Sequence, residues 1–328
     1  MQVSIIITSH NYGGYLRDAI DSALNQNWPD VEVIVVDDGS QDNSADIIDS
    51  YTGQITALYK RNGGQCSAVN AGVAESHGDV VILLDADDYL LPNAAELHVR
   101  CMQKPDVVKS CGYLDVIDTD GHLLGRRLPD RFGKSGNYLE ATLNYGLDIY
   151  GLSFTSGHAW SRSFLEQVLP LPEMDLIGPD GYLTAIDRLF GSIEFIPAPV
   201  GCYRRHGKNK GPMTQQFTRA FLQERIKSKD LRIEFAIAWA MKLGYPVDEK
   251  KLGKIRDWRI FLMRHLLSLM ERRKSPIGFT ELVFAPFQRF NASRYGSVLL
   301  AGGLLLIRFL PRELALPVSR RMLLRHHT

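Results

Sequence analysis

The chain has 328 residues, 45% of them hydrophobic and 23% charged, which is ordinary for a soluble globular protein and enough for one large α/β domain plus an appendage. The net charge is only +1, but residues 251–328 hold 15 Lys and Arg against 4 Asp and Glu, and residues 1–250 hold 23 against 33. This asymmetry predicts two surfaces with different partners. The four cysteines have neither metal-ligand spacing nor a paired framework, which excludes a disulfide scaffold and indicates a reducing cytosol.

Short apolar runs alternate with helical patterns along the first hundred residues, which is typical of a parallel, doubly wound sheet. The expected strands are 4–8, 32–36, 56–59 and 80–84, and the expected helices are 15–25, 44–51, 65–76 and 93–103. The sequence begins directly with the first strand and has no pattern of a secretory leader, so a cytoplasmic location is expected.

The rest of the chain is less regular. The sequence Asp118-Thr119-Asp120-Gly121 predicts a hairpin turn, and residues 181–190 predict a helix with one apolar face. Long helical patterns follow up to residue 243 and from 250 to about 273. The change of character near residue 213 predicts two parts, a catalytic domain over 1–212 and a basic, mostly helical region over 213–328.

An uncharged, apolar segment lies near the C-terminus at 296–307, with Arg294, Arg308 and Arg312 around it. A spanning helix needs about 20 apolar residues, so this segment is too short to cross a bilayer. Two interpretations stay open: an interfacial helix held to anionic lipid by its basic neighbours, or a helix buried in a C-terminal bundle or dimer interface. The basic residues at 320–327 favour the first.

Three carboxylates, Asp85, Asp87 and Asp88, directly follow the apolar run 80–84. In an extended backbone Asp85 and Asp87 project to the same side, and such a cluster at the end of a buried strand is costly unless it is compensated. A hard divalent cation, Mn²⁺ or Mg²⁺, with a phosphate completing its shell is the natural compensation. The alternative is a charged loop with one carboxylate capping the helix that starts near Pro92.

This cluster is the last of four blocks. The others are Val3-Ser-Ile-Ile-Ile-Thr-Ser-His-Asn-Tyr12, Val31-Glu-Val-Ile-Val-Val-Asp-Asp-Gly-Ser40 and Arg61-Asn-Gly-Gly-Gln-Cys-Ser-Ala-Val-Asn-Ala-Gly72. Their order and spacing resemble the inverting family-2 glycosyltransferases with the GT-A fold, specifically over residues 1–100 and more loosely to about 210. The resemblance implies an α/β fold with a Rossmann-like, mostly parallel sheet, a nucleotide-sugar donor and a divalent metal, Mn²⁺ or Mg²⁺.

The donor nucleotide is expected at the carboxyl ends of the first two strands, because ligands of open α/β sheets bind there. Thr8 offers a hydroxyl and Asp38 a carboxylate that can accept the imide N–H of a uracil. In the family, the matching residues contact the nucleoside. The alternative for Asp38-Gly39-Ser40 is a plain turn. The other expected donor residues are Asp37, Asn70, Asp85 and Ala86.

One departure from the family concerns the donor. Relatives often have an Arg where this chain has Val69, which leaves Lys60 or Arg61 to supply that contact and leaves the role of Gln65 open. The glycines that precede Gln65 match neither a dinucleotide fingerprint nor a Walker loop.

For the leaving diphosphate, Asp87 and Asp88 are the expected metal and phosphate residues, because a bound cation stabilises the charge that develops as the anomeric C–O bond breaks. The sequence Tyr203-Arg-Arg-His-Gly-Lys-Asn209 resembles the family's Tyr-Arg-x-His segment. That resemblance implies diphosphate or metal contacts for His206, Arg204 and Arg205. The alternative for His206 is an ordinary surface histidine.

The family places its catalytic base before a helix roughly a hundred residues after the metal motif, and the sequence Gly178-Pro179-Asp180-Gly181 fits that position. Asp180 would take the proton of the acceptor hydroxyl as the oxygen attacks the anomeric carbon from the opposite face, with inversion. Many relatives have Glu-Asp where this chain has Pro-Asp, and the alternative role of Asp180 is to cap the helix.

The acceptor is expected near residues 153–160, where Trp160 could stack on a sugar and His158 could hydrogen-bond one. Both are equally suited to a core.

These inferences predict a metal-assisted inverting glycosyltransferase, hexosyl- or N-acetylhexosaminyl-transferring, with a UDP-linked donor favoured. The expected acceptor is a glycan or lipid-linked glycan, and the expected location is peripheral on the inner face of the cell membrane. A nucleotidyltransferase and a non-catalytic nucleotide-binding module at the membrane are the alternatives. No nucleic-acid partner is expected, because the basic charges of the C-terminal region alternate with Leu and Phe.

Overall fold

The computed structural model describes residues 1–130, 132–147, 154–207, 209, 218–249 and 258–271. They form two compact units: one holds the described residues of 1–139 and 151–206, and the other those of 140–150 and 207–328. The apolar segment 296–307 and the basic C-terminal end lie outside the described residues. None of the helices in the described part of the chain has the length and apolar character needed to cross a bilayer.

The first unit is built on a ten-stranded sheet with the order β3-β2-β1-β4-β9-β6-β10-β5, in which β7 also pairs with β6 and β8 with β10. Its parallel half contains β1 (Val3–Ser9), β2 (Val31–Asp37), β3 (Thr56–Tyr59) and β4 (Val80–Asp85). The central strands β1 and β4 are runs of Val, Ile and Leu with almost no exposed surface. Such continuous apolar runs are typical of strands that helices cover on both faces. The four strands predicted from the first hundred residues are all confirmed.

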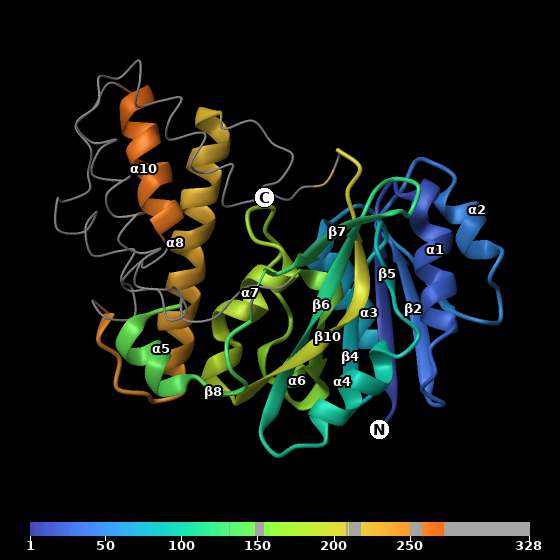
Figure 1. Ribbon diagram of the computed structural model, residues 1–328, viewed down its shortest axis with the longest axis horizontal. Helices are drawn as coiled ribbons and strands as arrows, with labels where there is room; N and C mark the ends of the chain where they lie inside the picture. Colours follow the sequence, from blue (N-terminus) through green and yellow to red (C-terminus); the bar gives the residue numbers. More distant parts are fainter. Residues whose placement is uncertain (131, 148–153, 208, 210–217, 250–257, 272–328) are drawn as a thin grey trace. The chain divides into compact units, whose positions relative to one another are not determined.

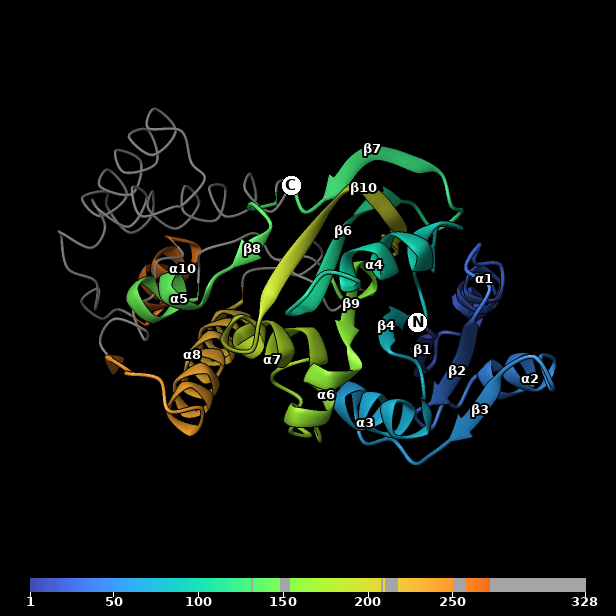
Figure 2. The same cartoon turned by 90° about the horizontal axis from the view of Figure 1, so that it is seen from below.

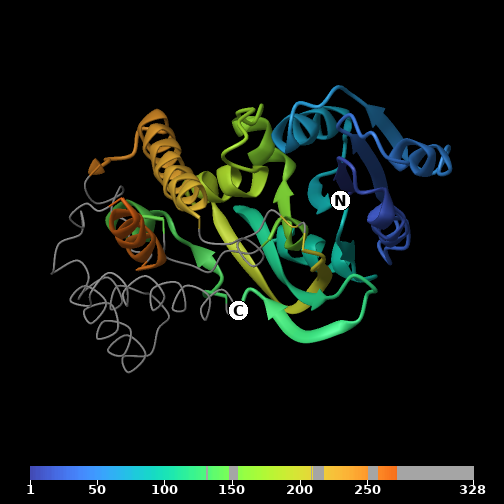
Figure 3. The same cartoon turned by 90° about the horizontal axis from the view of Figure 1, so that it is seen from above.

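The other half of the sheet is mixed. Strand β9 (His158–Ser161) lies antiparallel between β4 and β6 (Val107–Ile117), and β10 (Ser192–Arg204) runs parallel to β6. The predicted hairpin is confirmed, because β7 (Leu123–Leu128) returns antiparallel along β6 (Figure 3). The short strands β5 (Tyr89–Leu90) and β8 (Gly136–Asn137) pair with β10.

Helices cover both faces of this sheet. Helices α3 (Gln65–Glu75), α6 (Arg162–Val168) and α7 (Pro179–Ile186) lie along one face, and α1 (Gly13–Leu24) and α4 (Ala94–Met102) along the other (Figures 1 and 2). The short α2 (Ser44–Asp49) packs beside α1. The helix predicted at 181–190 begins two residues earlier, at Pro179, because proline suits the first helical position, and its last turn is a 3₁₀ helix over Asp187–Leu189.

In the second unit the described elements are α5 (Leu139–Tyr145, whose first residue belongs to the first unit), α8 (Arg219–Lys242) and α10 (Trp258–Met270). Helices α8 and α10 pack together through buried apolar residues such as Ile233 and Leu266. Two ion pairs also join them, Arg219 with Glu271 at 2.8 Å and Arg264 with Asp230 at 2.7 Å. The helical character predicted for this region is therefore confirmed over the described residues.

Candidate functional site

The carboxyl edge of the parallel strands brings together residues from three of the four sequence blocks. Because β1 lies between β2 and β4, Thr8 is in register with Asp85, and Ser9 is in register with Asp37. Thr8 is half-buried at this edge. The sheet therefore places a hydroxyl and two carboxylates side by side where open α/β sheets bind ligands.

The three carboxylates after β4 form a tight cluster. Asp85, Asp87 and Asp88 each offer an oxygen within 4.8 Å of the others. Burial, followed by repulsion from Asp87 and Asp180, raises the pKa of Asp85 to about 8. Burial and the same kind of repulsion hold the pKa of Asp88 well above its usual range. A divalent cation would offset this repulsion, and an all-oxygen donor set fits Mn²⁺ or Mg²⁺.

The members of the cluster differ in their partners. Asp88 is buried, accepts the Ser156 hydroxyl at 2.6 Å and accepts the backbone N–H of Arg204 at 2.9 Å, so it ties the end of β4 to β10. The side chain of Asp87 is more exposed, at 12%, and its Oδ2 lies 2.8 Å from His206 Nε2. Asp85, which is half-buried, and Asp87 are therefore more open to a ligand than Asp88.

The side chain of His206 is only 2% exposed, so it is not an ordinary surface histidine. Its ring stacks on Tyr15 with a centroid distance of 5.0 Å and meets the edge of Tyr12 at 5.8 Å. The aromatic rings and Asp87 hold the imidazole at the carboxylate cluster. The structure thus brings the 203–206 segment to the metal motif, as the resemblance implies.

Arg204 and Arg205 have different surroundings. The Arg204 guanidinium is buried, donates to Asp18 at 2.6 Å and to the carbonyl oxygen of Asp87 at 3.0 Å, and lies over the Tyr15 ring. It therefore holds the motif loop against α1, which corrects the expectation that its guanidinium binds the diphosphate. Arg205 is exposed and keeps the expected role as a proposal.

Asp180 lies in the first turn of α7 and is half-buried. The helix cap is Gly178, so the capping alternative for Asp180 is wrong. Its charge contributes to the raised pKa of Asp85, which places the two carboxylates within electrostatic range. The Gln65 side chain contacts both regions. Its Nε2 donates to Asp85 Oδ1 at 2.7 Å. Its Oε1 lies so close to Gly178, two residues before Asp180, that a Cβ at Gly178 would be 3.4 Å from it.

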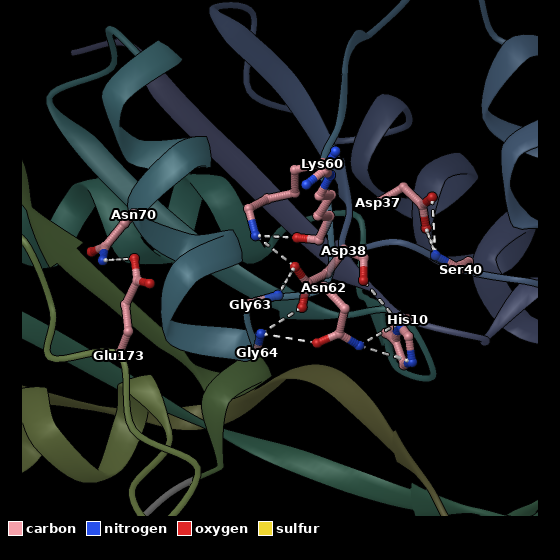
Figure 4. A network of polar contacts seen from close by, with 11 residues as sticks. His10, Asp37, Asp38, Ser40, Lys60, Asn62, Gly63, Gly64, Asn70 and Glu173 are labelled. Carbon is pink, nitrogen blue, oxygen red and sulfur yellow. Dashed lines mark hydrogen bonds and ion pairs between the residues drawn. The ribbon is translucent and has the colours of Figure 1, made fainter.

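Asp38 organises the loop that follows β3. Its carboxylate accepts the Lys60 ammonium at 2.7 Å and the backbone N–H groups of Gly63 and Gly64 at 2.9 and 2.8 Å (Figure 4). These contacts exceed those of a plain turn. Oδ1 accepts two of these hydrogen bonds and Oδ2 accepts one, so Oδ2 can accept a further one and a nucleobase contact remains compatible with this arrangement. Among the described residues, the Asp37 carboxylate accepts a hydrogen bond from the nearby Ser40 N–H at 3.3 Å.

Asn70 lies beside Glu173 of the loop before α7 (Figure 4). Its side chain accepts the Leu171 N–H at 2.7 Å and donates to the Leu171 carbonyl at 3.0 Å. Asn70 therefore holds that loop, and the donor contact expected for it stays a prediction. Ala86 is buried in the turn of the metal motif.

His158 and Trp160 both lie in the core on β9, with exposures of 1% and 0%. Trp160 packs on Phe164, and His158 packs on Trp160. Neither ring reaches a surface on which a sugar could stack, so the acceptor role expected for them is corrected to a core role.

Several residues of the site were not identified from the sequence. They are Tyr12 and Tyr15 around His206, Asp18 under Arg204, and Thr155 and Ser156, which hydrogen-bond Asp85 and Asp88. Their partners are distant in sequence, and hydroxyl or aromatic residues carry no spacing signal of their own.

Comparison with known proteins gives the following matches. The family model described as "Glycosyl transferase family 2" matches residues 4–168. An uncharacterized glycosyltransferase of Nostoc sp. PCC 7120 is 36% identical over 214 residues, which is 64% of this chain and 66% of that protein. The match therefore spans just under two thirds of that relative's length.

Two solved structures share the fold. S. aureus TarS 1-349 in complex with UDP-GlcNAc has a TM-score of 0.53 at 15% identity, covering 100% of this chain and 91% of that one. The mannosyltransferase PcManGT from Pyrobaculum calidifontis, in complex with GDP-Man and Mn²⁺, has a TM-score of 0.51 at 15% identity, covering 99% and 86%. At this identity the likeness concerns the fold alone.

Proposed function

The chain belongs to glycosyl transferase family 2 and has the GT-A fold, and on this premise we propose that it transfers a sugar from a nucleotide-sugar donor to an acceptor hydroxyl with inversion. The observation that carries the proposal is the carboxylate cluster at the end of β4, with Thr8 in register with Asp85, His206 on Asp87, and Asp180 next to the Gly178 turn that Gln65 approaches. This arrangement can bind a nucleotide, hold a diphosphate and take up a proton at one edge of the sheet.

The donor binds with its nucleoside at the ends of β1 and β2, near Thr8 and Asp38, and its diphosphate near Asp87. Asp87 and Asp88 would hold a divalent ion with support from Asp85, and Asp88 also fixes the loop that carries them. When bound, the cation offsets the charge of the departing diphosphate. The exposed Arg205 supplies a further positive group. A uridine donor is favoured, since Asp38 retains capacity to accept an imide N–H.

Asp180 acts as the general base. Its carboxylate accepts the proton of the acceptor hydroxyl while that oxygen forms a bond to the anomeric carbon, and the bond from that carbon to the diphosphate oxygen breaks on the opposite face. The electron pair of the broken bond leaves on the nucleoside diphosphate. Gln65 orients Asp85 beside this path through its 2.7 Å hydrogen bond.

We also propose the acceptor class and the location. The acceptor is a glycan or a lipid-linked glycan, and the protein acts as a peripheral protein at the inner face of the cell membrane. The support is the net positive charge of residues 251–328, because basic segments are attracted to anionic lipid surfaces.

A thermal-shift panel tests the proposal, with nucleotide sugars and nucleoside diphosphates each measured with Mn²⁺, Mg²⁺ or chelator. A ligand at about a hundred times its dissociation constant stabilises the protein by about 2.7 kcal/mol, which is easily measured. Metal-dependent stabilisation by one nucleotide series is the expected result. The absence of any shift would contradict the donor site.

A further inference from the structure

A buried ionic cluster lies on the α7 face of the sheet, away from the carboxylate edge. Lys109 of β6 is 0% exposed, and its ammonium donates to Thr184 Oγ1 at 2.9 Å and lies 3.2 Å from Asp187 Oδ2. Arg188 is also buried and contacts the other Asp187 oxygen at 3.3 Å. The Lys109 ammonium lies 4.5 Å from the centre of the Trp160 ring.

The partners of Lys109 share a helix face with the proposed base. Asp180, Thr184 and Asp187 are spaced by four and three residues, which places them on one side of α7 and its continuing turn. The same face that presents Asp180 toward Asp85 is therefore tied to β6 by Lys109 at its other end. Arg188 adds a bond back to the Thr184 carbonyl at 2.6 Å.

Stability alone gives little reason for such a cluster. Taking charges out of water costs about as much as their attraction returns, and well-packed apolar residues often serve stability equally well. An apolar contact, however, lets a helix slide or rotate on its sheet with little loss of free energy. Hydrogen bonds from one ammonium group to two groups on the helix instead define a single register between helix and strand. The opposite end of the segment is held separately, by the Cys66 thiol on the Ile177 carbonyl at 3.4 Å and by Asn70 on Leu171.

We infer that Lys109 is a positioning residue: its contacts with Thr184 and Asp187 set the register of α7 on β6 and thereby hold Asp180 at its place beside Asp85. The inference rests on the proposed function for its catalytic consequence. Its structural consequence, the fixed register of α7, stands independently of that function.

The test replaces the ion pair by apolar residues in the double variant Lys109→Met/Asp187→Leu, which removes one charge of each sign. Hydrogen exchange measured by mass spectrometry is expected to be about tenfold faster in peptides covering α7, with exchange in β1 and β4 retained. The thermal midpoint is expected to fall, because the buried Arg188 guanidinium loses its contact with Asp187. The matched control is Lys104→Met/Glu194→Leu, which removes an exposed ion pair of 2.8 Å between the chain after α4 and β10. This control is expected to leave α7 exchange unchanged.

Steady-state kinetics with the donor found by the thermal-shift panel supply the second readout. A displaced base predicts that kcat falls by about tenfold to a hundredfold while the KM for the donor stays within about twofold, because small misplacements of a reacting group are costly. A role confined to stability predicts wild-type kcat once the double variant is folded. Unchanged α7 exchange together with unchanged kcat would overturn the inference.

Two further outcomes also test the inference. If the double variant does not fold, the single variant Lys109→Arg takes its place, because it keeps the charge but changes the length of the side chain. The same changes in α7 exchange and kcat are expected for it, and their absence overturns the inference.

If the wild-type protein transfers no sugar from any donor, the proposed function fails. Hydrogen exchange in α7 alone then decides whether Lys109 sets the register.

Discussion

The side-chain amide of Gln65 donates to Asp85 Oδ1 over 2.7 Å. This bond links the first residue of α3 to the last residue of β4 and aligns the metal motif with the loop that leads to Asp180. Because Gln65 also lies beside Gly178, it connects the part of the site proposed for the donor with the part proposed for the acceptor.

Asp180→Asn is expected to lower kcat by about 10²–10⁴-fold, the usual contribution of a general base, with donor affinity retained because the amide keeps the size of the carboxylate. Initial rates and nucleotide binding measured on the same preparation check this. Asp175→Asn is the matched control, since Asp175 is an exposed acid on the loop before α7. Near-wild-type turnover of Asp180→Asn would show that another group is the base.

Asp87→Ala is expected to abolish the stabilisation that UDP with Mn²⁺ confers, because the variant lacks one carboxylate of the proposed metal site. Thermal shifts with Mn²⁺ and with chelator measure this. Among the described residues a second acidic group, Asp118, Asp120 and His122, has similar spacing on the exposed hairpin, so Asp120→Ala is the control and should retain the full shift. Equal losses in both variants would contradict a site at Asp87.

Arg204→Met and Arg205→Met are expected to differ in kind. The first removes the Arg204 donor from the buried Asp87 carbonyl group and should lower the free energy of unfolding by about 1–3 kcal/mol. The second changes an exposed side chain, so urea unfolding should be unchanged while binding of UDP with Mn²⁺ weakens. A stable Arg204→Met protein with weak nucleotide binding would reverse this assignment.

Acid is expected to destabilise the protein through two buried histidines. Burial lowers the pKa of His98 to about 3 and the pKa of His158 well below its usual range, so below pH 6.5 the unfolded chain binds protons that the folded chain does not. Their contribution is present above about pH 6.5 and is lost as the pH falls toward the folded values. The expected loss is about 1.4 kcal/mol per pH unit for each histidine.

Urea unfolding at pH 8 and pH 5 measures this effect. His98→Gln should reduce the difference between the two pH values, because one of the two groups no longer titrates. The control His77→Gln concerns a side chain that is 77% exposed and should leave the difference as it is. An identical pH dependence in wild type and His98→Gln would refute this explanation.

Sequence patterns determined the first half of the catalytic unit. The strands β1 to β4 and the intervening helices are predicted by local periodicity. The carboxylates Asp85, Asp87 and Asp88 come directly after a buried strand, at the edge where parallel sheets bind ligands. The positions of Thr8 and Asp38 at that edge follow from the same rule. These features depend on interactions between residues close in the chain, so they can be predicted from the sequence.

Only the tertiary structure decided which of the later residues face the cluster. The insertion of β9 between β4 and β6 buries Trp160 and His158, and the return of β10 buries the Arg204 guanidinium against Asp18 while it brings His206 to Asp87. The cluster around Lys109 likewise joins β6 to α7 across a long stretch of chain. Such contacts depend on the order of the strands in the sheet and on which side chains that order buries. Neither can be predicted from local sequence patterns.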